Sequence, residues 1–490
     1  MITRNQLSMA DIFSDCQDIL DLDKPRFLDL LETYINLDEI VPSSFREHFY
    51  APTGRPRNYS LESMLWALIL QRIFSIPTDT LLLTFLHYSR HLRQFCGFDK
   101  VPDASKITRF KQDFCDDLQV VFDRLVDLTE PICQQIDPEL AYMTIFDSTG
   151  IEAWVKENNP KYLNSMIRGL TAFAKAKGLG DSFDPHKAAY GRMPSHAEAE
   201  SEVKQQYVNG HFCYAYKAGI VSNGLGIPRA IDFYDESFFE AHPEITREKK
   251  SDSPDEDKSV GDNRLLLPTL KGFFAKHPLI QPNTFLGDSA FDAIETYKAL
   301  LTGDTFGENR HFSKALIPLN SRATPSLPDY TVNESGIPCC PHDPQLPMKP
   351  EGNTSHLRCG IPTFKFVCPK MSWDKGEDGK YHRVCHCEDP CTSSKSGRMI
   401  YVYPERDLRL YPGTIRDTDE WTRTYKIRGS VERTINQFKD SCGLDGRRTR
   451  NAKTLRADLI LCGITQLITV LLADSIHQHQ HIRSLKKLVA

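Results

Sequence analysis

Four residues near the C-terminal end of the chain could do chemistry together. In "TYKIRGSVERTINQFK", residues 424–439, Tyr425, Arg428, Glu432 and Lys439 follow one another at offsets of 3, 4 and 7. A helix turns by about 100° per residue, so these four side chains would fall within about 60° of one another. Such a stripe could supply one metal-binding carboxylate beside cations that hold phosphate groups.

An apolar stripe lies beside the charged one on the same predicted helix. Ile427, Val431, Ile435 and Phe438 span about 80° of the helical wheel and would dock the helix against a core. The charged stripe also has an ordinary interpretation, a solvated helix face with an ion pair between residues four apart. The choice between a functional face and a solvated one depends on the other motifs of the chain.

Two more carboxylates end apolar runs that predict strands. Asp147 ends the run in "LAYMTIFDSTG", and Asp288 ends the run in "NTFLGDSAFD". Ligands of α/β sheets gather at the carboxyl ends of strands. Each aspartate alone is better explained as an ordinary turn residue. Together with Glu432 they would give three hard oxygen donors from separate elements, a set that suits Mg²⁺.

Charge is distributed unevenly along the chain. The 490 residues carry a formal net charge of −5, which excludes a globally basic protein. The segment 422–456 nevertheless holds ten lysines and arginines against three acidic residues. A basic patch of that density fits a polyanion such as nucleic acid.

Residues 1–135 have the pattern of helices. Leu61–Ile73 is apolar at helical spacing behind the N-cap residue Ser60, and a second helix is expected from Thr78. "VPDASKITRFKQDF" predicts a turn and a short helix that resembles the reader of a helix-turn-helix, although an ordinary exposed helix has the same pattern. This helix would turn Ile107, Phe110 and Phe114 inward and Ser105, Lys106, Arg109 and Gln112 outward.

The rest of the chain alternates strands, helices and insertions. Residues 130–139 are expected to form a linker, and 156–205 a polar, irregular insertion. Strands are expected on both sides of the Ser-Asn-Gly turn in 211–234 and again in 313–320. Helices are expected at Leu265–Phe274, Ala293–Leu301 and from about Asp419. This order predicts a mixed α/β core that is interrupted more than once.

With these motifs in view, the chain resembles bacterial insertion-sequence transposases of the DDE type. The C-terminal motif matches that family's Y-x2-R-x3-E-x6-K signature at every spacing, and "IFDST" and "FLGDSAFD" resemble its two aspartate strands. The resemblance covers roughly residues 40–475. It implies an RNase H-like catalytic core with Asp147, Asp288 and Glu432 as the catalytic triad.

The resemblance also implies cofactors and partners. The triad would hold two Mg²⁺ or Mn²⁺ ions, and Tyr425, Arg428 and Lys439 would contact DNA. The substrate would be double-stranded DNA, at the terminal inverted repeats of the element and at the target, bound by a homodimer or higher oligomer. One site would cleave and then transfer the strand. The rival functions are a metal nuclease of the same fold that does not join strands and an inactive derivative that only binds DNA.

These observations predict five segments. A helical, helix-turn-helix-like DNA-binding domain at 1–135 precedes the first part of the core at 136–325. A Cys-rich insertion at 326–403 separates it from the second part of the core at 404–475, and a tail follows at 476–490.

The Cys-rich segment could hold a structural zinc ion. Seven cysteines fall within residues 339–391, with four histidines among them. Small irregular domains often need a metal, but the spacings differ from the usual C-x2-C pairs. Free thiols are the alternative, and disulfides rank third in a reducing compartment. The residues concerned are Cys339, Cys340, Cys359, Cys368, Cys385, Cys387, Cys391, His342, His356, His382 and His386.

The sequence does not predict export or membrane insertion. The N-terminus lacks the apolar region of a secretory signal. The longest apolar run, Leu459–Ala473, is interrupted by polar residues, is too short to span a bilayer and is expected to form a buried helix. We therefore expect a cytoplasmic, nucleoid-associated protein with no membrane partner.

Overall fold

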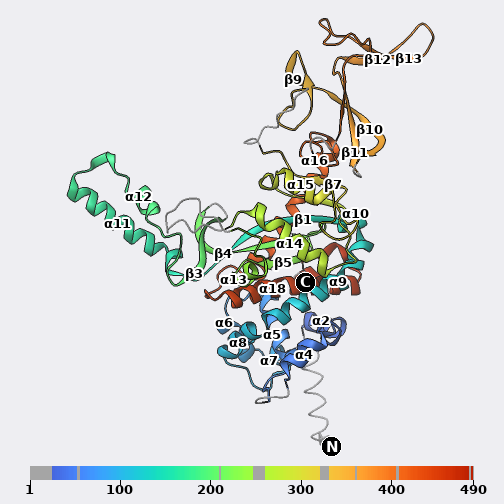
Figure 1. Cartoon of the computed structure of the whole chain (residues 1–490). Coiled ribbons are helices and arrows are strands. Elements are labelled where there is room, and N and C mark those ends of the chain that lie inside the picture. The colour runs from blue at the N-terminus through green and yellow to red at the C-terminus, as the bar shows by residue number, and fades with distance from the viewer. Residues whose placement is uncertain are drawn as a thin grey trace, which may run out of the picture. The chain divides into compact units, whose positions relative to one another are not determined.

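The chain folds into two compact units (Figure 1). The computed structural model describes residues 25–51, 56–208, 211–246, 260–320, 330–358, 361–403, 408–484 and 487–488. Unit 1 combines Met1–Ile132 with Asn436–Ala490, and unit 2 is Cys133–Ile435. The N-terminal stretch used above to argue against export lies outside the described residues.

The described elements of unit 1 are helices. Two of these helices begin where the sequence predicted. The Ser60 side chain caps α5 by accepting a hydrogen bond from the Ser63 backbone, and the Thr78 side chain caps α6 by accepting one from the Leu81 backbone. The N-terminal helices are α2 (Arg26–Tyr34), α3 (Leu37–Ile40), α4 (Ser43–Phe49), α5 (Leu61–Ile73), α6 (Asp79–Tyr88), α7 (Arg90–Phe95), α8 (Ala104–Asp113) and α9 (Cys115–Ile136). The C-terminal elements are the π-helical turn η5 (Gln437–Ser441), α18 (Ala452–Ser475) and η6 (His479–His481).

Helix α8 presents the two faces that its sequence predicts. Ile107, Phe110 and Phe114 are buried, while Lys106 and Arg109 are exposed. Gln112 is the exception, because its side chain is half-buried and donates a hydrogen bond of 3.1 Å to the Thr454 hydroxyl.

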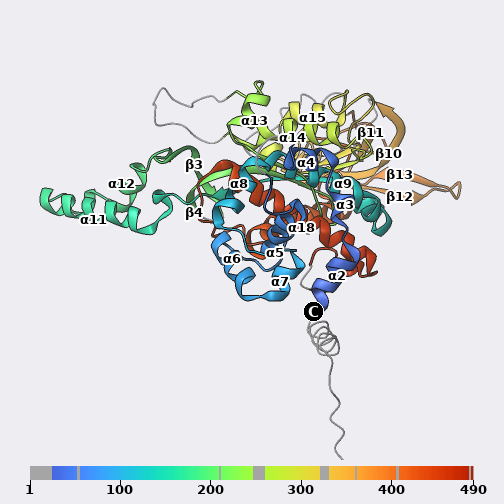
Figure 2. The same ribbon diagram turned by 90° about the horizontal axis from the view of Figure 1, so that it is seen from below.

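Helix α18 is the central helix of unit 1. It packs against α2, α5 and α8 (Figure 2). Its length and composition would allow it to cross a membrane, but 89% of its most apolar window is buried. A helix that is apolar on all sides must be covered on all sides, so the prediction of a buried helix is confirmed. This requirement explains why residues from Asn436 onward join unit 1, whereas the sequence analysis assigned all of 404–475 to the core.

The predicted linker at 130–139 contains the boundary between the two units, after Ile132, but it is helical. Helix α9 continues through Pro131 to Ile136, and the short helix α10 (Pro138–Ala141) follows. Proline removes one backbone hydrogen bond and usually ends or kinks a helix. Here Val126 and Cys133, on either side of it, are both fully buried, so side-chain burial outweighs the local cost.

Unit 2 is built on a mixed sheet of seven strands. Their order is β2-β3-β4-β1-β6-β7, and β5 also pairs with β4. Strands β1 to β5 pair antiparallel, whereas β6 lies parallel to β1 and to β7. The strands are β1 (Met143–Glu152), β2 (His196–Ala197), β3 (Glu200–Val208), β4 (His211–Ser222), β5 (Pro228–Phe233), β6 (Thr284–Leu286) and β7 (Lys314–Leu316). The mixed α/β class predicted from sequence is therefore confirmed.

Helices flank these strands. They are α13 (Glu236–Ala241), α14 (Asp262–Lys276), the short turn η3 (Ser289–Phe291) and α15 (Ile294–Leu301). Helices α14 and α15 lie where the sequence predicted helices, whereas α13 and η3 were not predicted. Asp292, between η3 and α15, has a fully buried side chain that connects this region to Arg409. Asp292 accepts hydrogen bonds of 2.6–3.0 Å from the Arg409 guanidinium and one of 3.0 Å from the Tyr297 hydroxyl.

The segment 156–205 is more regular than expected. It contains η1 (Lys156–Asn158), α11 (Pro160–Lys177), η2 (Gly180–Ser182) and α12 (Pro185–Gly191) before β2 begins. Asn159 caps α11 and is followed by proline, and Gly178 ends the helix in the left-handed conformation. These are ordinary start and stop signals that the polar composition of the segment concealed.

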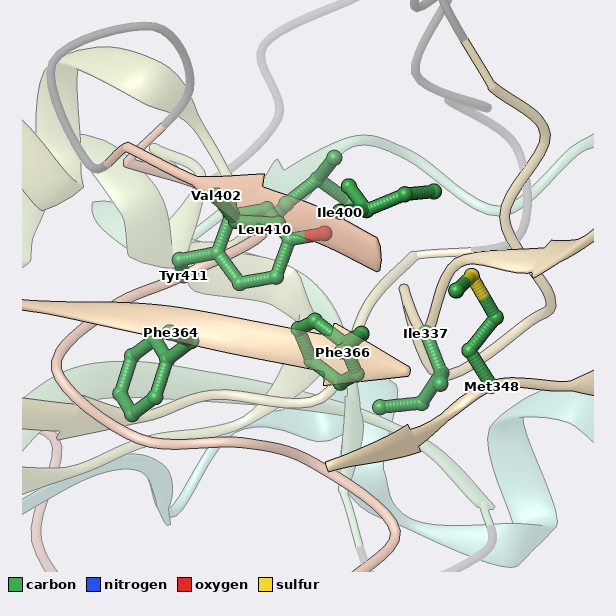
Figure 3. Packing of buried hydrophobic residues seen from close by; sticks show 8 residues of the cluster. All are labelled: Ile337, Met348, Phe364, Phe366, Ile400, Val402, Leu410 and Tyr411. Atoms are coloured by element: carbon green, nitrogen blue, oxygen red, sulfur yellow. The ribbon is translucent and has the colours of Figure 1, made fainter. Parts of the chain in front are cut away.

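The Cys-rich segment forms small antiparallel sheets. Their strands are β8 (Cys339–Cys340), β9 (Asp343–Pro347), β10 (Lys349–Arg358), β11 (Ile361–Val367), β12 (Met371–Lys375), β13 (Tyr381–Cys385) and β14 (Met399–Val402). The segment shares an apolar core (Figure 3) with Leu410 and Tyr411, which follow it in the chain; the other members are Ile337, Met348, Phe364, Phe366, Ile400 and Val402. A core of this size supplies part of the stability that a bound metal would otherwise supply.

Candidate active site

The parallel pairing of β1 and β6 brings the two predicted aspartates side by side. Ile145 on β1 is in register with Leu286 on β6. Asp147 and Asp288 each follow two residues later, so they lie level with one another where the parallel pairing ends. This is the edge of a parallel pair at which ligands gather.

Strand β1 does not end at Asp147 as predicted. It runs on to Glu152, because its other neighbour, β4, pairs with it from Ile145 to Glu152. Antiparallel pairing on one side therefore overrides the turn composition of "DSTG". Asp147 thus sits on a continuous strand, and its carboxylate also accepts a hydrogen bond of 2.9 Å from the Ser148 backbone.

Asp288 lies just beyond the end of β6. Its carboxylate accepts a hydrogen bond of 2.5 Å from the Ser289 backbone at the start of η3. The carbonyl of the preceding residue, Gly287, accepts a hydrogen bond of 3.4 Å from the Tyr425 hydroxyl. Tyr425 in turn stacks on Trp421, with ring centroids 5.8 Å apart. Tyr425 therefore connects the signature segment to the loop that holds Asp288.

The signature segment is helical, but its winding changes three times. Helix α16 (Asp419–Tyr425) leads into the 3-10 turn η4 (Lys426–Arg428), then α17 (Gly429–Asn436) and the π-helical turn η5 (Gln437–Ser441). In a 3-10 turn, residues three apart eclipse one another, so Tyr425 and Arg428 align more closely than in an α-helix. The apolar side of α17 is buried as predicted.

One guanidinium lies among all three predicted catalytic carboxylates. Arg428 forms an ion pair of 2.6 Å with Glu432, one of 3.4 Å with Asp147 and one of 3.5 Å with Asp288. The three carboxylates come from positions more than a hundred residues apart. Asp147 is mostly covered, whereas the Asp288 and Glu432 side chains are about half exposed, at 51% and 52%. The structure thus brings together four of the residues selected from sequence, counting Arg428 with the triad.

Burial and charge act against each other at this site. Burial raises the pKa of Asp147 to about 6; Arg428 lowers it, while Glu432 and Asp262 raise it. Burial lowers the pKa of Arg428, but the surrounding carboxylates and Tyr425 outweigh this effect and raise it overall. The pKa of Tyr425 is raised by its burial. An aspartate with such a raised pKa beside other charged groups is typical of functional sites.

The sequence analysis missed a polar group beside Asp147. The Ser148 hydroxyl donates a hydrogen bond of 2.8 Å to Asp262, which also pairs with Lys217. Neighbouring strand residues point to opposite faces, so this group supports β1 from the face opposite Asp147. Asp262 begins α14, and nothing in its sequence context distinguishes it from an ordinary first-turn acidic residue.

Lys439 differs from its prediction in exposure. It lies in the π-helical turn η5 and belongs to unit 1. Only 4% of Lys439 is exposed, whereas the sequence analysis expected it on the exposed stripe with Arg428. The extra residue per turn of a π-helix shifts the following side chains around the axis, which the regular wheel did not include.

The described residues contain no group of three or more carboxylate, thiol or imidazole side chains arranged to share one metal ion. At the candidate active site, the Arg428 guanidinium lies between the carboxylates. In the Cys-rich segment, the described cysteines are free thiols, and Cys359 lies outside the described residues. Cys368 and Cys385 are close neighbours in a small apolar cluster. Zinc binding in this segment stays a prediction.

In unit 1, helix α8 carries basic residues that the sequence predicted to contact DNA. Lys106 and Arg109 line a cavity of about 310 Å³ together with Arg57. The Arg57 guanidinium lies over the Phe49 and Phe114 rings, at 4.9 and 5.3 Å from their centroids. Both rings are buried and support the Arg57 guanidinium from below, while the exposed cations of this surface suit a polyanion.

Comparison with known proteins gives one match. No curated protein and no solved structure matches the chain significantly. Residues 15–113 match the family model described as a transposase domain (DUF772). The matched region includes the helices from α2 to α8 as far as the structure describes them. This similarity supports placing the chain in a transposase family, whose members would act on DNA, and indicates a function in transposition.

Proposed function

We propose that this chain is a DDE transposase of an insertion sequence. It binds the terminal inverted repeats of the element and catalyses metal-dependent cleavage and transfer of DNA strands. The observation that carries the proposal is the meeting of Asp147, Asp288 and Glu432 around one cation, Arg428. These carboxylates come from two neighbouring strands and a late helix, the order of elements that the family resemblance implies.

The mixed sheet supports an RNase H-like core. The first aspartate lies on a central strand, and the second follows the strand parallel to it, so the fold provides a shared edge for both. Helix α17 then supplies the third carboxylate, while its buried residues dock it within unit 2. The Thr434 hydroxyl donates a hydrogen bond of 2.9 Å to the Gly226 carbonyl in the β4–β5 turn.

The donor set fits Mg²⁺ or Mn²⁺. Asp147, Asp288 and Glu432 would hold two such ions. When bound, these ions lower the pKa of an attacking water and stabilise charge in an in-line phosphoryl transfer. The carboxylates already gather round a cation, the guanidinium of Arg428. Metal and guanidinium would therefore compete for the same oxygens.

The chain's own residues bind and orient the substrate. A guanidinium released from the carboxylates presents a two-pronged donor that fits a phosphate group. Tyr425, fixed by Trp421 and by the Gly287 carbonyl, can contact the nucleotide at the cleaved end. The same proposal includes a contact between Lys439 and DNA and helix-turn-helix recognition of DNA by α8. It also includes a cytoplasmic location and assembly on DNA as a dimer or higher oligomer.

A strand-cleavage assay tests the proposal. The substrate is a duplex that carries the inverted repeat found beside the gene, incubated with full-length protein and Mg²⁺ or with chelator. We expect metal-dependent nicking at the repeat end, followed by joining of the free 3′-OH to a target duplex. Nicking without joining would support the nuclease instead, and DNA binding without nicking would support the inactive derivative.

A further inference from the structure

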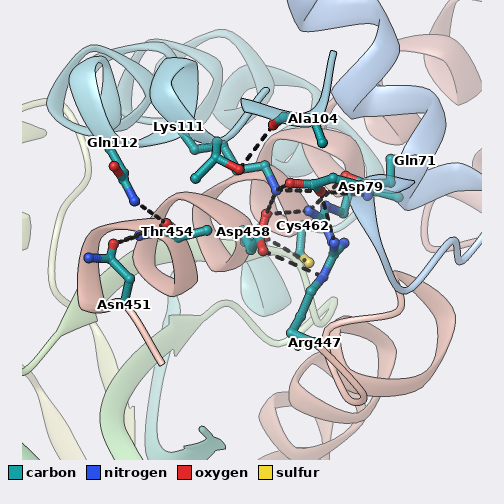
Figure 4. A network of polar contacts seen from close by, with 12 residues as sticks. Gln71, Asp79, Ala104, Lys111, Gln112, Arg447, Asn451, Thr454, Asp458 and Cys462 are labelled. Carbon is teal, nitrogen blue, oxygen red and sulfur yellow. Dashed lines mark hydrogen bonds and ion pairs between the residues drawn. The ribbon is translucent and has the colours of Figure 1, made fainter. Parts of the chain in front are cut away.

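Unit 1 contains a buried network of charged side chains (Figure 4). Asp458 on α18 forms ion pairs with Arg72 at 2.5 Å and with Lys111 at 2.9 Å. Lys111 also pairs with Asp79 at 2.7 Å. Arg447 approaches both carboxylates, at 3.6 Å from Asp79 and 3.5 Å from Asp458. Four separate helices and a loop thus meet in one polar cluster.

The network has more positive than negative charge. Three cations, Arg72, Lys111 and Arg447, face two carboxylates, and each of these cations is at most 3% exposed. One nitrogen of the Arg447 guanidinium, Nη2, has neither a hydrogen-bond partner nor contact with solvent. An unbalanced buried charge is strongly unfavourable unless a counter-ion joins it. The network therefore favours the binding of an anion.

A cavity of about 530 Å³ adjoins the network. Its lining includes Lys111 and Arg447, together with Arg448, which is exposed at the rim. The N-terminal ends of α6 and α18 both contribute to this lining, and helix N-termini favour anions. Six threonines also line the cavity, namely Thr78, Thr80, Thr84, Thr108, Thr449 and Thr454. The hydroxyls of Thr84, Thr108 and Thr454 already donate hydrogen bonds within the protein, to Thr80, Ala104 and Asn451.

We infer that this cavity binds a phosphate group of the DNA backbone. A phosphate is small enough for the cavity, carries the missing negative charge and accepts hydrogen bonds from guanidinium and hydroxyl groups alike. The chain that forms the rim continues through the basic run "RRTRNAK", residues 447–453, as a backbone-binding surface requires. The assignment of DNA as the source of the phosphate rests on the proposed function.

The first experiment uses inorganic phosphate as the probe. The melting temperature of the full-length, metal-free protein is measured in phosphate and in chloride at equal ionic strength. Phosphate should raise it by a few degrees, since a ligand of the folded state stabilises it. Arg447→Gln should lose this increment, whatever it does to the basal melting temperature. Arg448→Gln and Thr449→Val, at the accessible rim, should reduce the increment in melting temperature. They replace Arg447→Gln in the test if that variant does not fold.

Arg124→Gln is the matched control, because Arg124 is an exposed residue of α9 outside the cavity lining. It should keep the full phosphate increment. An increment that is absent from the wild type, or that survives in all three cavity variants, would overturn the phosphate site.

The second experiment identifies the source of the phosphate. Binding of a duplex is measured against salt concentration for wild type, Arg448→Gln and Arg124→Gln. Loss of one phosphate contact should lower the salt slope by about one unit in Arg448→Gln alone. A phosphate increment with unchanged DNA binding would overturn the DNA assignment and leave free phosphate as the ligand. Failure of the wild type to cleave DNA, with both arms as expected, would instead overturn the proposed function and not this site.

Discussion

Two charged clusters in this molecule are built with opposite surpluses. At the candidate active site, three carboxylates surround the single cation Arg428, which leaves a net negative charge. In the network of unit 1, three cations surround two carboxylates, which leaves a net positive charge. By charge alone, the first cluster can accept additional cations and the second an anion.

Exposure separates the clusters as clearly as charge does. Asp288 and Glu432 are about half exposed, whereas Asp458 and Lys111 are each 1% exposed. An exposed carboxylate can change partners at little cost in stability, and a buried one cannot. We therefore expect substitutions in the first cluster to affect reaction and metal binding, and substitutions in the second to affect folding.

The largest expected effect is on strand cleavage. Asp147→Asn, Asp288→Asn and Glu432→Gln should each lower the cleavage rate at least about 1,000-fold, because groups that act as a unit fail together. DNA affinity should change little, since phosphate contacts supply most of it. Nicking of end-labelled duplex and a gel-shift titration measure the two quantities.

Glu295→Gln is a suitable control for this set, because Glu295 is an exposed carboxylate on α15 in the same unit. It should cleave at the wild-type rate. Substantial cleavage by any of the three site variants would remove that residue from the triad.

The next effect is on stability and belongs to the buried network. Asp458→Asn leaves Arg72, Lys111 and Arg447 with one carboxylate, so the free energy of unfolding should fall by about 3–5 kcal/mol. Asp474→Asn on the same helix is the matched control. Asp474 pairs with His479 near the surface, where such pairs are worth at most about 1 kcal/mol. Urea denaturation compares them, and equal losses would mean that the network is not a special feature of unit 1.

The sequence was informative where local pattern and tertiary structure agree. The caps of α5 and α6, the buried face of α8 and the apolar helix α18 all follow from spacing and composition alone. The two aspartates were selected from sequence because each ends an apolar run. Their closeness depends on the parallel pairing of β1 with β6, which spacing alone does not reveal.

The failures share a physical cause, which is that long-range contacts overrode local signals. Pairing with β4 carried β1 past Asp147, and burial on both sides carried α9 past Pro131. The change to a π-helical turn moved Lys439 into a buried position. The contacts of Asp262 and the network around Asp458 join residues so far apart in sequence that no local pattern indicates them.

Substitution of Asp147 at the candidate active site should stabilise the fold, whereas Asp458→Asn should destabilise it, and the effect should be smaller. Burial raises the pKa of Asp147 from 3.8 in the unfolded reference to about 6. The ionised carboxylate therefore destabilises the metal-free fold above pH 6, and this penalty is lost as pH falls from about 6 to 4. At pH 7.5 in chelator, Asp147→Asn should raise the free energy of unfolding by about 1–3 kcal/mol.

The pH dependence of urea denaturation tests this sign. The advantage of Asp147→Asn over wild type should shrink as pH falls below 6. Asp288→Asn is the control, because Asp288 is about half exposed, and it should show little advantage at any pH. A loss of stability in Asp147→Asn at pH 7.5 would mean that Arg428 stabilises the ionised carboxylate more than burial destabilises it.

Competition between metal and guanidinium predicts an effect on binding. Arg428→Gln removes the cation that lies among the carboxylates, so Mn²⁺ should bind several-fold more tightly in the absence of DNA. Cleavage should still fall, because the phosphate contact is lost. Arg428→Lys should recover little of it, since an ammonium lacks the two-pronged geometry. Titration calorimetry with Mn²⁺ measures the first effect, and unchanged affinity would show that Arg428 does not compete with metal.

The smallest effects concern the remaining basic residues of the signature segment. Lys426 and Arg433 are exposed and point away from the carboxylates on the helical wheel, so their Ala variants should change stability by less than about 0.5 kcal/mol. Their DNA salt slopes should match the wild type. Lys439→Ala should instead cost stability, because its side chain is buried. Arg428→Ala should lower affinity for cut ends and flatten the slope by about one unit.

These four variants test whether the segment has a functional side at all. Only Arg428 lies among the carboxylates, so only Arg428→Ala should combine weaker DNA binding with lost cleavage. A flattened slope in Lys439→Ala at unchanged stability would show that Lys439 contacts phosphate despite its burial. If all four variants bind, cleave and unfold alike, the ion pairs of Arg428 are ordinary surface contacts, and the contrast between the two clusters reduces to burial alone.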